Sequence, residues 1–370
     1  MVKAAVLTAE RRLEMRDIPA PDAPPAGGAL LAMEGCGMCG SDVEQYEGEV
    51  VRMGMMTFPC IPGHEPVGRL AAVDREAGRR WGLKEGDRVA VHGVAPCGAC
   101  QACREGRACI DAFYYGFRSL GVGSGLWGGF AETMEIAPRT RLYPISERIS
   151  IEDALLFNPL AAGFDWVLRL AEVKLDESVL VLGGGQRGLA SVIAAKEAGA
   201  SKIIVTGLRR DAFKLEIARK LGATDTLVVE DVDVREEVGR ITGGLGVDKV
   251  IETTPLAFSP IADALATARP GGTIVLAGLK ANKPMPEFPV DEVITRRLKI
   301  VGALSSSDWS VAQAIRTIES GRYPLALMHT HSLPLEQVEH AVHLLAGEVP
   351  TDTPLHISIL PQMSASGSTP

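Results

Sequence analysis

The sequence predicts an α/β protein with two domains, a β-rich domain at the N-terminal end and a central domain built on a doubly wound parallel sheet. The chain has 370 residues, which suits two domains of roughly 150 residues or more each. Residues 1 to about 155 contain short strand-like segments broken by turn residues. From about 156 to 305, short apolar segments alternate with helical ones, an order typical of a parallel sheet covered on both faces.

The individual elements follow from these patterns. In the β-rich part, the clearest strand candidates are residues 1–7, 29–32 and 87–91. In the central part, the expected strands are residues 178–182, 202–206, 247–252, 273–277 and 299–304, with helices at residues 189–198 and 211–221. Further helices are expected at residues 308–321 and 335–345, and the small polar tail at 364–370 is expected to be disordered.

Composition and charge argue against several classes of function. The net charge is −8, whereas nucleic-acid binding needs a basic surface. No apolar run reaches the roughly 18 residues of a membrane span, and the apolar start of the chain is too short for a signal peptide. All seven cysteines lie within the first 109 residues. In a cytosolic chain of this size, clustered cysteines more often bind metal than form disulfides. We therefore expect a cytoplasmic protein with a small-molecule ligand and no nucleic-acid or membrane partner.

A glycine-rich turn predicts a dinucleotide site. The segment Gly183-Gly-Gly-Gln-Arg-Gly188 directly follows an apolar strand and opens a helix, which is the context that makes this pattern specific. Gly183 permits the tight turn, Gly185 lets the backbone approach a pyrophosphate, and Gly188 permits close packing of helix and strand. The helix N-terminus, which includes Gln186 and Arg187, supplies amide donors and a partial positive charge. At the ends of the later strands, we expect cofactor contacts from Thr253, Gly278, Leu279, Ala303 and Leu304.

The end of the second strand bears on the choice of cofactor. An NAD site usually has an acidic residue there for the ribose 2′-hydroxyl. In this chain Gly207 occupies the place, and Arg209 and Arg210 follow it. Arginine offers forked, charge-assisted donors to a 2′-phosphate, so the sequence favours NADP, with NAD as the alternative. The competing interpretation is that both arginines are solvated and that Asp211 only caps the next helix.

Two groups of residues predict metal sites. Cys97, Cys100, Cys103 and Cys109 have the spacing of four thiolates that close a tetrahedral structural zinc site. Elsewhere, Cys39-Gly-Ser41-Asp42 and the later Gly63-His64-Glu65 offer a thiolate, an imidazole and a carboxylate, which suit an open catalytic zinc site. The remaining histidines considered, His92, His329, His331, His340 and His343, have no companion ligands at useful spacing, so solvated or structural roles are expected for them.

Taken in order, these motifs resemble the zinc-containing medium-chain alcohol, polyol and sugar dehydrogenases. The resemblance also includes Gly128-Gly-Phe-Ala-Glu132 and runs over nearly the whole chain. It implies a GroES-like catalytic domain, split into residues 1–155 and 306–370, around a Rossmann-type domain at residues 156–305. It further implies that Cys39 and His64 bind the catalytic zinc, that Ser41 passes on the alcohol proton, and that Asp42 orients a ligand. Glu65 is either a ligand or a carboxylate behind the metal.

The chain departs from the family pattern at three places. Asn158, before Pro-Leu, stands where a further zinc ligand, Cys or Glu, is usual, so Asn158, Glu65 or a water completes the shell. Glu44 replaces the histidine that often ends the proton relay, and it could still accept a proton. The last gap of the cysteine group is five residues rather than the usual seven, which makes Cys109 the least certain of its ligands.

These features predict an enzyme with two zinc ions per chain that moves a hydride between an alcohol and NAD(P), reversibly reducing a ketone or aldehyde. The alcohol class is a secondary alcohol, a polyol or a sugar. The alternatives are a zinc-free enone or quinone reductase of the same architecture and a non-enzymatic dinucleotide-binding protein. Since the resemblance puts the apolar strand 299–304 at a sheet edge, we also expect a homodimer or homotetramer.

Overall fold

The computed structural model describes residues 1–105, 107 and 109–364. The predicted disorder of the tail concerns residues 364–370, of which all but the first lie outside this description. The chain divides into two compact units, one of residues 1–157 with 329–370 and one of residues 158–328. The second boundary thus differs from the expected 305/306. The physical reason is helix α12 (Asp308–Ser320), whose cap residues Ser307 and Ser310 both donate to Asp165 inside the second unit.

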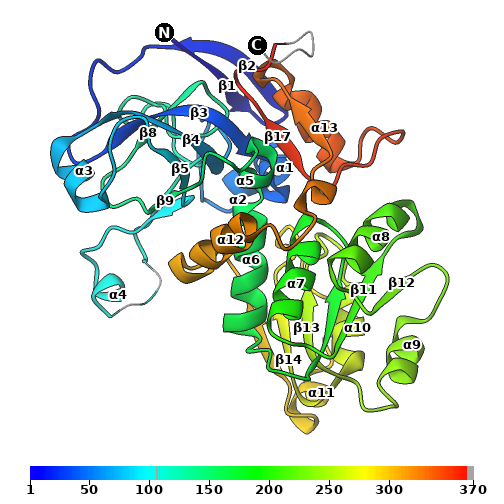
Figure 1. Ribbon diagram of the computed structural model, residues 1–370. Coiled ribbons are helices and arrows are strands. Elements are labelled where there is room, and N and C mark those ends of the chain that lie inside the picture. Colours follow the sequence, from blue (N-terminus) through cyan, green and yellow to red (C-terminus); the bar gives the residue numbers. More distant parts are fainter. Residues whose placement is uncertain (106, 108, 365–370) are drawn as a thin grey trace. The chain divides into compact units, whose positions relative to one another are not determined.

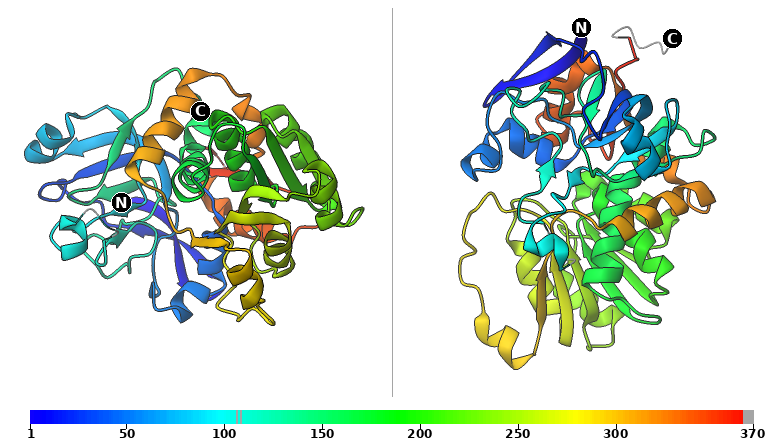
Figure 2. Two further views of the ribbon diagram at one scale, coloured as in Figure 1. Left: turned by 90° about the horizontal axis from the view of Figure 1, so that it is seen from below. Right: turned by 90° about the vertical axis from the view of Figure 1, so that its left-hand side faces the viewer.

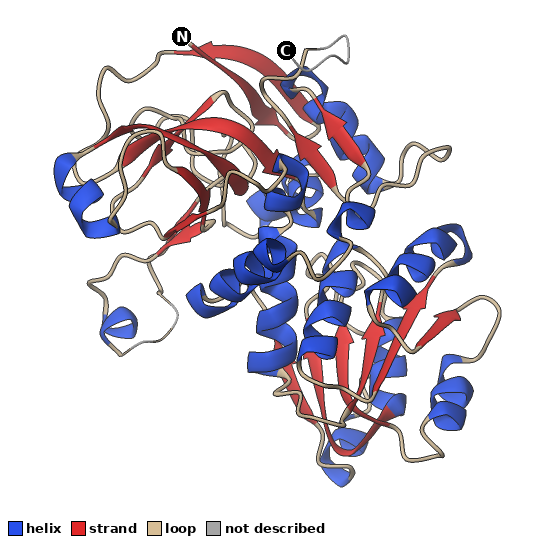
Figure 3. Ribbon diagram, viewed as in Figure 1, coloured by secondary structure: helices blue, strands red, loops and turns tan. Residues whose placement is uncertain are grey.

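The first unit is β-rich (Figures 1 and 3). A seven-stranded sheet has the order β16-β17-β3-β4-β5-β9, and β8 also pairs with β3. Its strands are β3 (Ala29–Gly37), β4 (Glu65–Val73), β5 (Arg88–Val91), β8 (Thr133–Ile136), β9 (Leu142–Pro144), β16 (His331–Leu333) and β17 (Ile357–Ile359). Two smaller sheets pair β1 (Val2–Ala9) with β2 (Arg12–Ile18) and β6 (Val94–Ala95) with β7 (Phe113–Tyr114). The C-terminal segment therefore completes the sheet that the N-terminal segment begins.

Helices in this unit are short and lie between the strands. They are α1 (Gly40–Tyr46), α2 (Glu49–Arg52), α3 (Arg75–Trp81), α4 (Gln101–Arg104), α5 (Ile151–Leu155) and α13 (Val338–Ala346). The expected helix 335–345 is split, because residues 335–337 form a 3₁₀ turn before α13. One apolar core is shared by both chain segments of the unit, with residues such as Met33, Tyr115, Phe130, Val342 and Ile357 packed together.

The second unit contains a six-stranded, fully parallel sheet in the order β12-β11-β10-β13-β14-β15. The strands are β10 (Ser178–Leu182), β11 (Lys202–Gly207), β12 (Asp225–Val228), β13 (Val247–Glu252), β14 (Ala268–Leu276) and β15 (Lys299–Gly302). Every residue of β10 is buried, as a central strand covered on both faces requires. The chain order reverses between β10 and β13, and ligands of such sheets bind outside the strand ends at this point.

Helices cover both faces of this sheet (Figure 1). They are α6 (Phe157–Phe164), α7 (Gln186–Glu197), α8 (Ala212–Leu221), α9 (Val234–Ile241), α10 (Ser259–Thr267), α11 (Val290–Thr295) and α12. The segment between β14 and α11 extends from the sheet as a long loop (Figure 2, right). Several expected boundaries were wrong. β14 begins five residues early, β15 ends two residues early, and a 3₁₀ turn at 209–211 precedes α8.

Among the described residues, no helix combines the length and apolar character needed to cross a bilayer.

Candidate active site and metal centres

The first candidate metal site begins at the end of β3, where the chain turns into α1. Cys39 is the residue before this helix, and its backbone amide donates to Asp42 Oδ2 at 2.8 Å. This bond satisfies an amide that the helix leaves without a partner, so it fixes how Cys39 enters the helix. Cys39 and Asp42 are both buried, and Ser41 between them is partly exposed.

His64 and Glu65 reach the same place from β4. Register pairs Gly37 of β3 with Glu65, so the two strands bring Cys39 and His64 together. Gly63, just before them, has a φ of +89°, and an added Cβ there would lie 2.8 Å from the Phe130 ring. Only glycine therefore permits this turn without displacing Phe130.

The ligand atoms of Cys39, His64 and Glu65 all lie within 4.8 Å of one another. His64 Nδ1 faces Asp42 Oδ1 at 3.4 Å, and its Nε2 lies 3.9 Å from Glu65 Oε1. An imidazole held by a carboxylate on one nitrogen presents the other nitrogen to a metal. The arrangement of a thiolate, an imidazole and a carboxylate fits Zn²⁺ with room for one further ligand.

Electrostatics favour a cation at this cluster. Burial alone would lower the pKa of His64, but Asp42 and Cys39 together raise that pKa well above its usual value. Three acidic groups thus surround one imidazole in a largely buried space. A bound divalent cation would compensate these charges. Ser41 Oγ donates to Cys39 Sγ at 3.1 Å and lies 3.4 Å from His64 Nε2, so its hydroxyl is next to the expected ligands.

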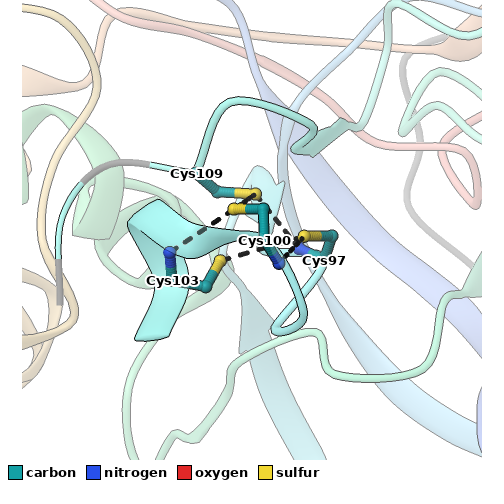
Figure 4. A group of neighbouring side chains, drawn as sticks. All are labelled: Cys97, Cys100, Cys103 and Cys109. Atoms are coloured by element: carbon teal, nitrogen blue, oxygen red, sulfur yellow. Dashed lines mark hydrogen bonds between the residues drawn. The ribbon is translucent and has the colours of Figure 1, made fainter. Parts of the chain in front are cut away.

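The second candidate metal site is the four-cysteine group, whose sulfur atoms also lie within 4.8 Å of one another (Figure 4). Sulfur–sulfur distances of 3.9 Å join Cys97 to Cys103 and Cys100 to Cys109. Cys109 therefore belongs to the group in spite of its short gap. Backbone amides donate to these sulfur atoms, and the amide of Cys103 lowers the pKa of Cys100 to about 6. Thiolates in this geometry fit a closed structural zinc site.

The glycine turn has the backbone that the sequence pattern requires. Gly183 has a φ of +107°, and an added Cβ on Gly188 would lie 1.9 Å from the Gly183 carbonyl oxygen. Apart from its two chain neighbours, no described residue has an atom within 4 Å of the Cβ position of Gly185, the residue before α7. The N-terminus of α7, with Gln186 and Arg187 in its first turn, is thus open to a ligand at Gly185.

Arg209, just after the end of β11, already interacts with acidic residues of this unit. Its guanidinium forms an ion pair with Asp231, and its backbone amide donates to Glu230 Oε2 at 2.9 Å. Sequence reasoning missed these two acidic residues, because they follow the neighbouring strand β12. Gly207 ends β11, and a Cβ there would lie 3.0 Å from the Leu215 side chain. Arg210, on the same turn, is exposed.

The remaining expected cofactor residues lie at the carboxyl ends of three neighbouring strands. Thr253 Oγ1 donates to the carbonyl oxygen of Gly183 at 3.2 Å, which ties the end of β13 to the glycine turn. Gly278 is in contact with the backbone of Thr254, and Leu279 accepts a backbone bond from Leu256. Ala303 and Leu304 follow β15, and the Leu304 side chain is exposed.

Asn158 and Glu44 are the two expected site residues outside the group of Cys39, His64 and Glu65. Asn158 begins the second unit, and its Oδ1 accepts from Arg187 Nη2 at 3.5 Å. Glu44 lies on α1 with a partly exposed side chain, and its carboxylate is not among the ligand atoms that come within 4.8 Å of one another. The roles expected for both residues therefore stay predictions.

Sequence reasoning also missed two groups of polar residues, because each member is isolated in the chain. His356, which was not considered, is fully buried and pairs with His329, for which no companion was expected. Glu252 is fully buried at the end of β13, and Lys280 Nζ lies 3.1 Å from it. Burial raises the pKa of Glu252, and Lys280 opposes that rise.

Comparisons with known proteins agree with this geometry. A model described as the alcohol dehydrogenase GroES-like domain matches residues 25–147, and one described as zinc-binding dehydrogenase matches residues 188–320. A probable alcohol dehydrogenase of Mycobacterium tuberculosis is 39% identical over 98% of this chain and 99% of its own. A sorbitol dehydrogenase of Bacillus subtilis is 31% identical over 92% of each chain.

Solved structures resemble the chain over nearly its full length. A putative zinc-binding dehydrogenase from Sinorhizobium meliloti, bound to NADP, has a TM-score of 0.85 at 26% identity and covers 98% of this chain and 99% of its own. An alcohol dehydrogenase from Thermotoga maritima has a TM-score of 0.85 at 25% identity, with 97% and 99% covered.

Proposed function

The chain belongs to the zinc-containing medium-chain alcohol dehydrogenases, and on that premise we propose how its residues carry out the reaction. It is an NAD(P)-dependent oxidoreductase that acts on an alcohol, with a GroES-like domain and a Rossmann-type domain. The observation that carries the proposed site is the cluster of Cys39, His64 and Glu65 beside the Ser41 hydroxyl. The named relatives act on alcohols and polyols, so a zinc-free reductase and a non-enzymatic protein gain no support.

In this proposal Cys39, His64 and Glu65 hold the catalytic zinc and leave one position for substrate or water. A zinc ion at this site would lower the pKa of the substrate hydroxyl, and the nicotinamide cofactor would carry the hydride. Asp42 accepts a hydrogen bond from the Cys39 amide and lies 3.4 Å from His64 Nδ1, so its carboxylate is placed to orient both ligands. Ser41 Oγ takes up the proton of the substrate hydroxyl and passes it toward Glu44 or solvent.

The proposed cofactor site is the carboxyl edge of the parallel sheet, at the order reversal between β10 and β13. There the N-terminus of α7 at Gly185 would hold the pyrophosphate of the cofactor, and residues at the later strand ends would hold its nicotinamide half. NADP is the favoured cofactor, as in the Sinorhizobium meliloti structure.

A cytoplasmic location is proposed from the free thiols, which a reducing compartment preserves.

The substrate class is tested by steady-state kinetics on secondary alcohols, polyols and sugars with both cofactors at defined zinc occupancy. We expect turnover of at least one of these groups. Turnover of enones or quinones alone, in a protein free of zinc, would overturn the proposal.

Two zinc ions per chain are expected from elemental analysis of freshly purified protein. Cys100→Ala should remove one of them and lower Tm by about 10 °C or more, because loss of a structural metal is among the larger single-residue effects. A matched control is Cys60→Ala, since Cys60 is a buried thiol outside both candidate sites. That variant should keep both zinc ions. One zinc or none in the unmodified protein would contradict the assignment.

Self-association through the edge of the second unit is also proposed. Within the described residues β15 pairs only with β14, and apolar side chains nearby are exposed, with Val290 at 55%, Ile294 at 65% and Leu304 at 73%. An apolar sheet edge invites a partner subunit.

Light scattering at working concentration should give a multiple of 39.3 kDa. Ile294→Lys should weaken this association by about tenfold or more, because the charge would be buried in the contact. Leu245→Lys is the matched control, since Leu245 is 74% exposed on the loop between α9 and β13. A monomeric mass for the unmodified protein, or equal effects of both changes, would refute this surface.

A further inference from the structure

A buried carboxylate lies at the end of a central strand in the second unit. Glu252 is the last residue of β13, which pairs with β10 on one side and with β14 on the other (Figure 1). Its side chain is fully buried, and its Oε2 atom has no hydrogen-bond partner among the residues that the structure describes. Burial of an ionised carboxylate is costly unless a partner compensates the charge. The ionised form of Glu252 therefore depends on the group that faces it.

Lys280 faces Glu252 from the next strand end. Its Nζ atom lies 3.1 Å from Glu252 Oε1, and only 12% of the lysine side chain is exposed. Lys280 belongs to the loop between β14 and α11, so the ion pair joins the carboxyl ends of two adjacent strands. Burial raises the pKa of Glu252, and Lys280 opposes that rise. The lysine thus favours the ionised carboxylate.

The ion pair also binds both backbone groups of Thr254. The Thr254 amide donates to Glu252 Oε1 at 2.8 Å, and Lys280 Nζ donates to the Thr254 carbonyl oxygen. β13 ends two residues earlier, so Thr254 lies beyond the backbone ladder that pairs such groups inside the sheet. The two charged side chains therefore replace the ladder and fix the chain where it leaves the sheet.

Thr254 and its neighbour Thr253 connect this strand end to the glycine turn. The Thr254 hydroxyl donates to the carbonyl oxygen of Leu182 at 3.1 Å, and the Thr253 hydroxyl donates to that of Gly183 at 3.2 Å. A Cβ on Gly183 would lie 2.8 Å from Thr253 Oγ1 and 3.1 Å from Thr254 Oγ1. The two threonines therefore pack directly against the turn, and the ion pair that holds Thr254 also determines where they lie.

We propose that Lys280 is a positioning residue for the nicotinamide cofactor, and that it acts by compensating the charge of Glu252. The inference rests on the proposed cofactor site at the glycine turn. While the two charges are paired, the end of β13 stays against the turn and keeps Thr253 in place. Without Lys280, an ionised Glu252 would have to leave its buried position for water, and the backbone bound to it would move as well.

Other charged groups around these strands are paired elsewhere. β10 has no charged residue. Arg269 of β14 forms an ion pair with Asp248 near the start of β13, and Asp263 of α10 forms one with Arg235. If Lys280 is removed, a change of cofactor affinity with pH, measured relative to the unmodified protein, is therefore assigned to Glu252.

The test measures the Kd of NADPH by its fluorescence on the full chain, at about pH 6 and about pH 8, always relative to the unmodified protein. Lys280→Met keeps the length of the side chain but removes its charge and its donors. At the higher pH we expect Kd to rise by about tenfold, because a buried carboxylate is left without compensation. Since burial raises the pKa of Glu252, its ionised form is disfavoured in the folded state, so the loss should be smaller at the lower pH.

The double variant Glu252→Gln with Lys280→Met separates charge compensation from packing. It leaves no buried charge, and glutamine still offers an acceptor to the Thr254 amide, so Kd should return to within about threefold of the unmodified value at both pH values. Lys283→Met is the matched control, because Lys283 is an exposed lysine on the same loop, and it should bind NADPH like the unmodified protein.

Should Lys280→Met fail to fold, Lys280→Gln decides, with a smaller loss of affinity in the same direction. Unchanged affinity at the higher pH in a folded Lys280→Met variant, or in Lys280→Gln if it must decide, would overturn the inference alone. A loss that the double variant retains would also overturn it, because Lys280 would then act without Glu252. Absence of NADPH and NADH binding by the unmodified protein would overturn the proposed cofactor site as well.

Discussion

Replacing Cys39 by alanine is expected to lower kcat/KM for alcohol oxidation by about 10³-fold or more in a chain that still folds. The Lewis acidity of a bound metal contributes several kcal/mol to such reactions, and each 1.36 kcal/mol is worth a factor of ten in rate. Cys39 supplies the thiolate of the cluster with His64 and Glu65, and its sulfur accepts from Ser41. The variant should therefore lose one zinc ion together with the activity.

Asn158→Ala provides the comparison. The Asn158 amide oxygen accepts from Arg187, and a neutral amide is a weak zinc ligand, so this variant should keep both zinc ions. Zinc content, circular dichroism and Tm, measured on both variants, separate loss of the metal from loss of the fold. Retained activity in Cys39→Ala, or loss of catalytic zinc in Asn158→Ala, would contradict the proposed ligand set.

The ratio of kcat/KM with NADP to kcat/KM with NAD should change by about 10- to 100-fold for each charged group that is altered at the end of β11. A hydrogen bond to a charged group contributes roughly 1.5–3 kcal/mol, and about 1.4 kcal/mol is a factor of ten in affinity. The unmodified enzyme should therefore have the higher kcat/KM with NADP. Gly207→Asp should erase or reverse that preference, because a carboxylate would repel the 2′-phosphate and accept from the 2′-hydroxyl of NAD.

Gly207→Ala is the matched control for this change. An added Cβ at residue 207 lies 3.0 Å from Leu215, so any variant here must displace that side chain slightly. The alanine variant displaces the Leu215 side chain in the same way but adds no charge, so it should keep the preference for NADP. Arg210→Ala and Arg209→Ala identify the donor. Since Arg209 is paired with Asp231, we expect Arg210 to have the larger effect. A higher kcat/KM with NAD in the unmodified enzyme would show that neither arginine binds a 2′-phosphate.

Local sequence was sufficient for features that depend on neighbouring residues. The parallel sheet followed from apolar strands that alternate with helices, and the glycine turn at 183–188 followed from the strand before it and the helix after it. The four-cysteine group is equally local, since its members lie within thirteen residues and their own backbone amides hold the sulfur atoms. Element boundaries were less well predicted, because caps and 3₁₀ turns such as 209–211 depend on contacts that propensity does not contain.

Only the tertiary structure decided which distant residues meet. Asp231 reaches Arg209 because β11 and β12 are adjacent in the sheet, and no spacing in the sequence shows this. His356 was overlooked as an isolated histidine, yet strand pairing brings it, across Gly37, to the same face as Glu65. The physical reason is that motifs record short-range order along the chain, whereas the partners of a buried polar group are set by sheet register and by the space that a glycine leaves open.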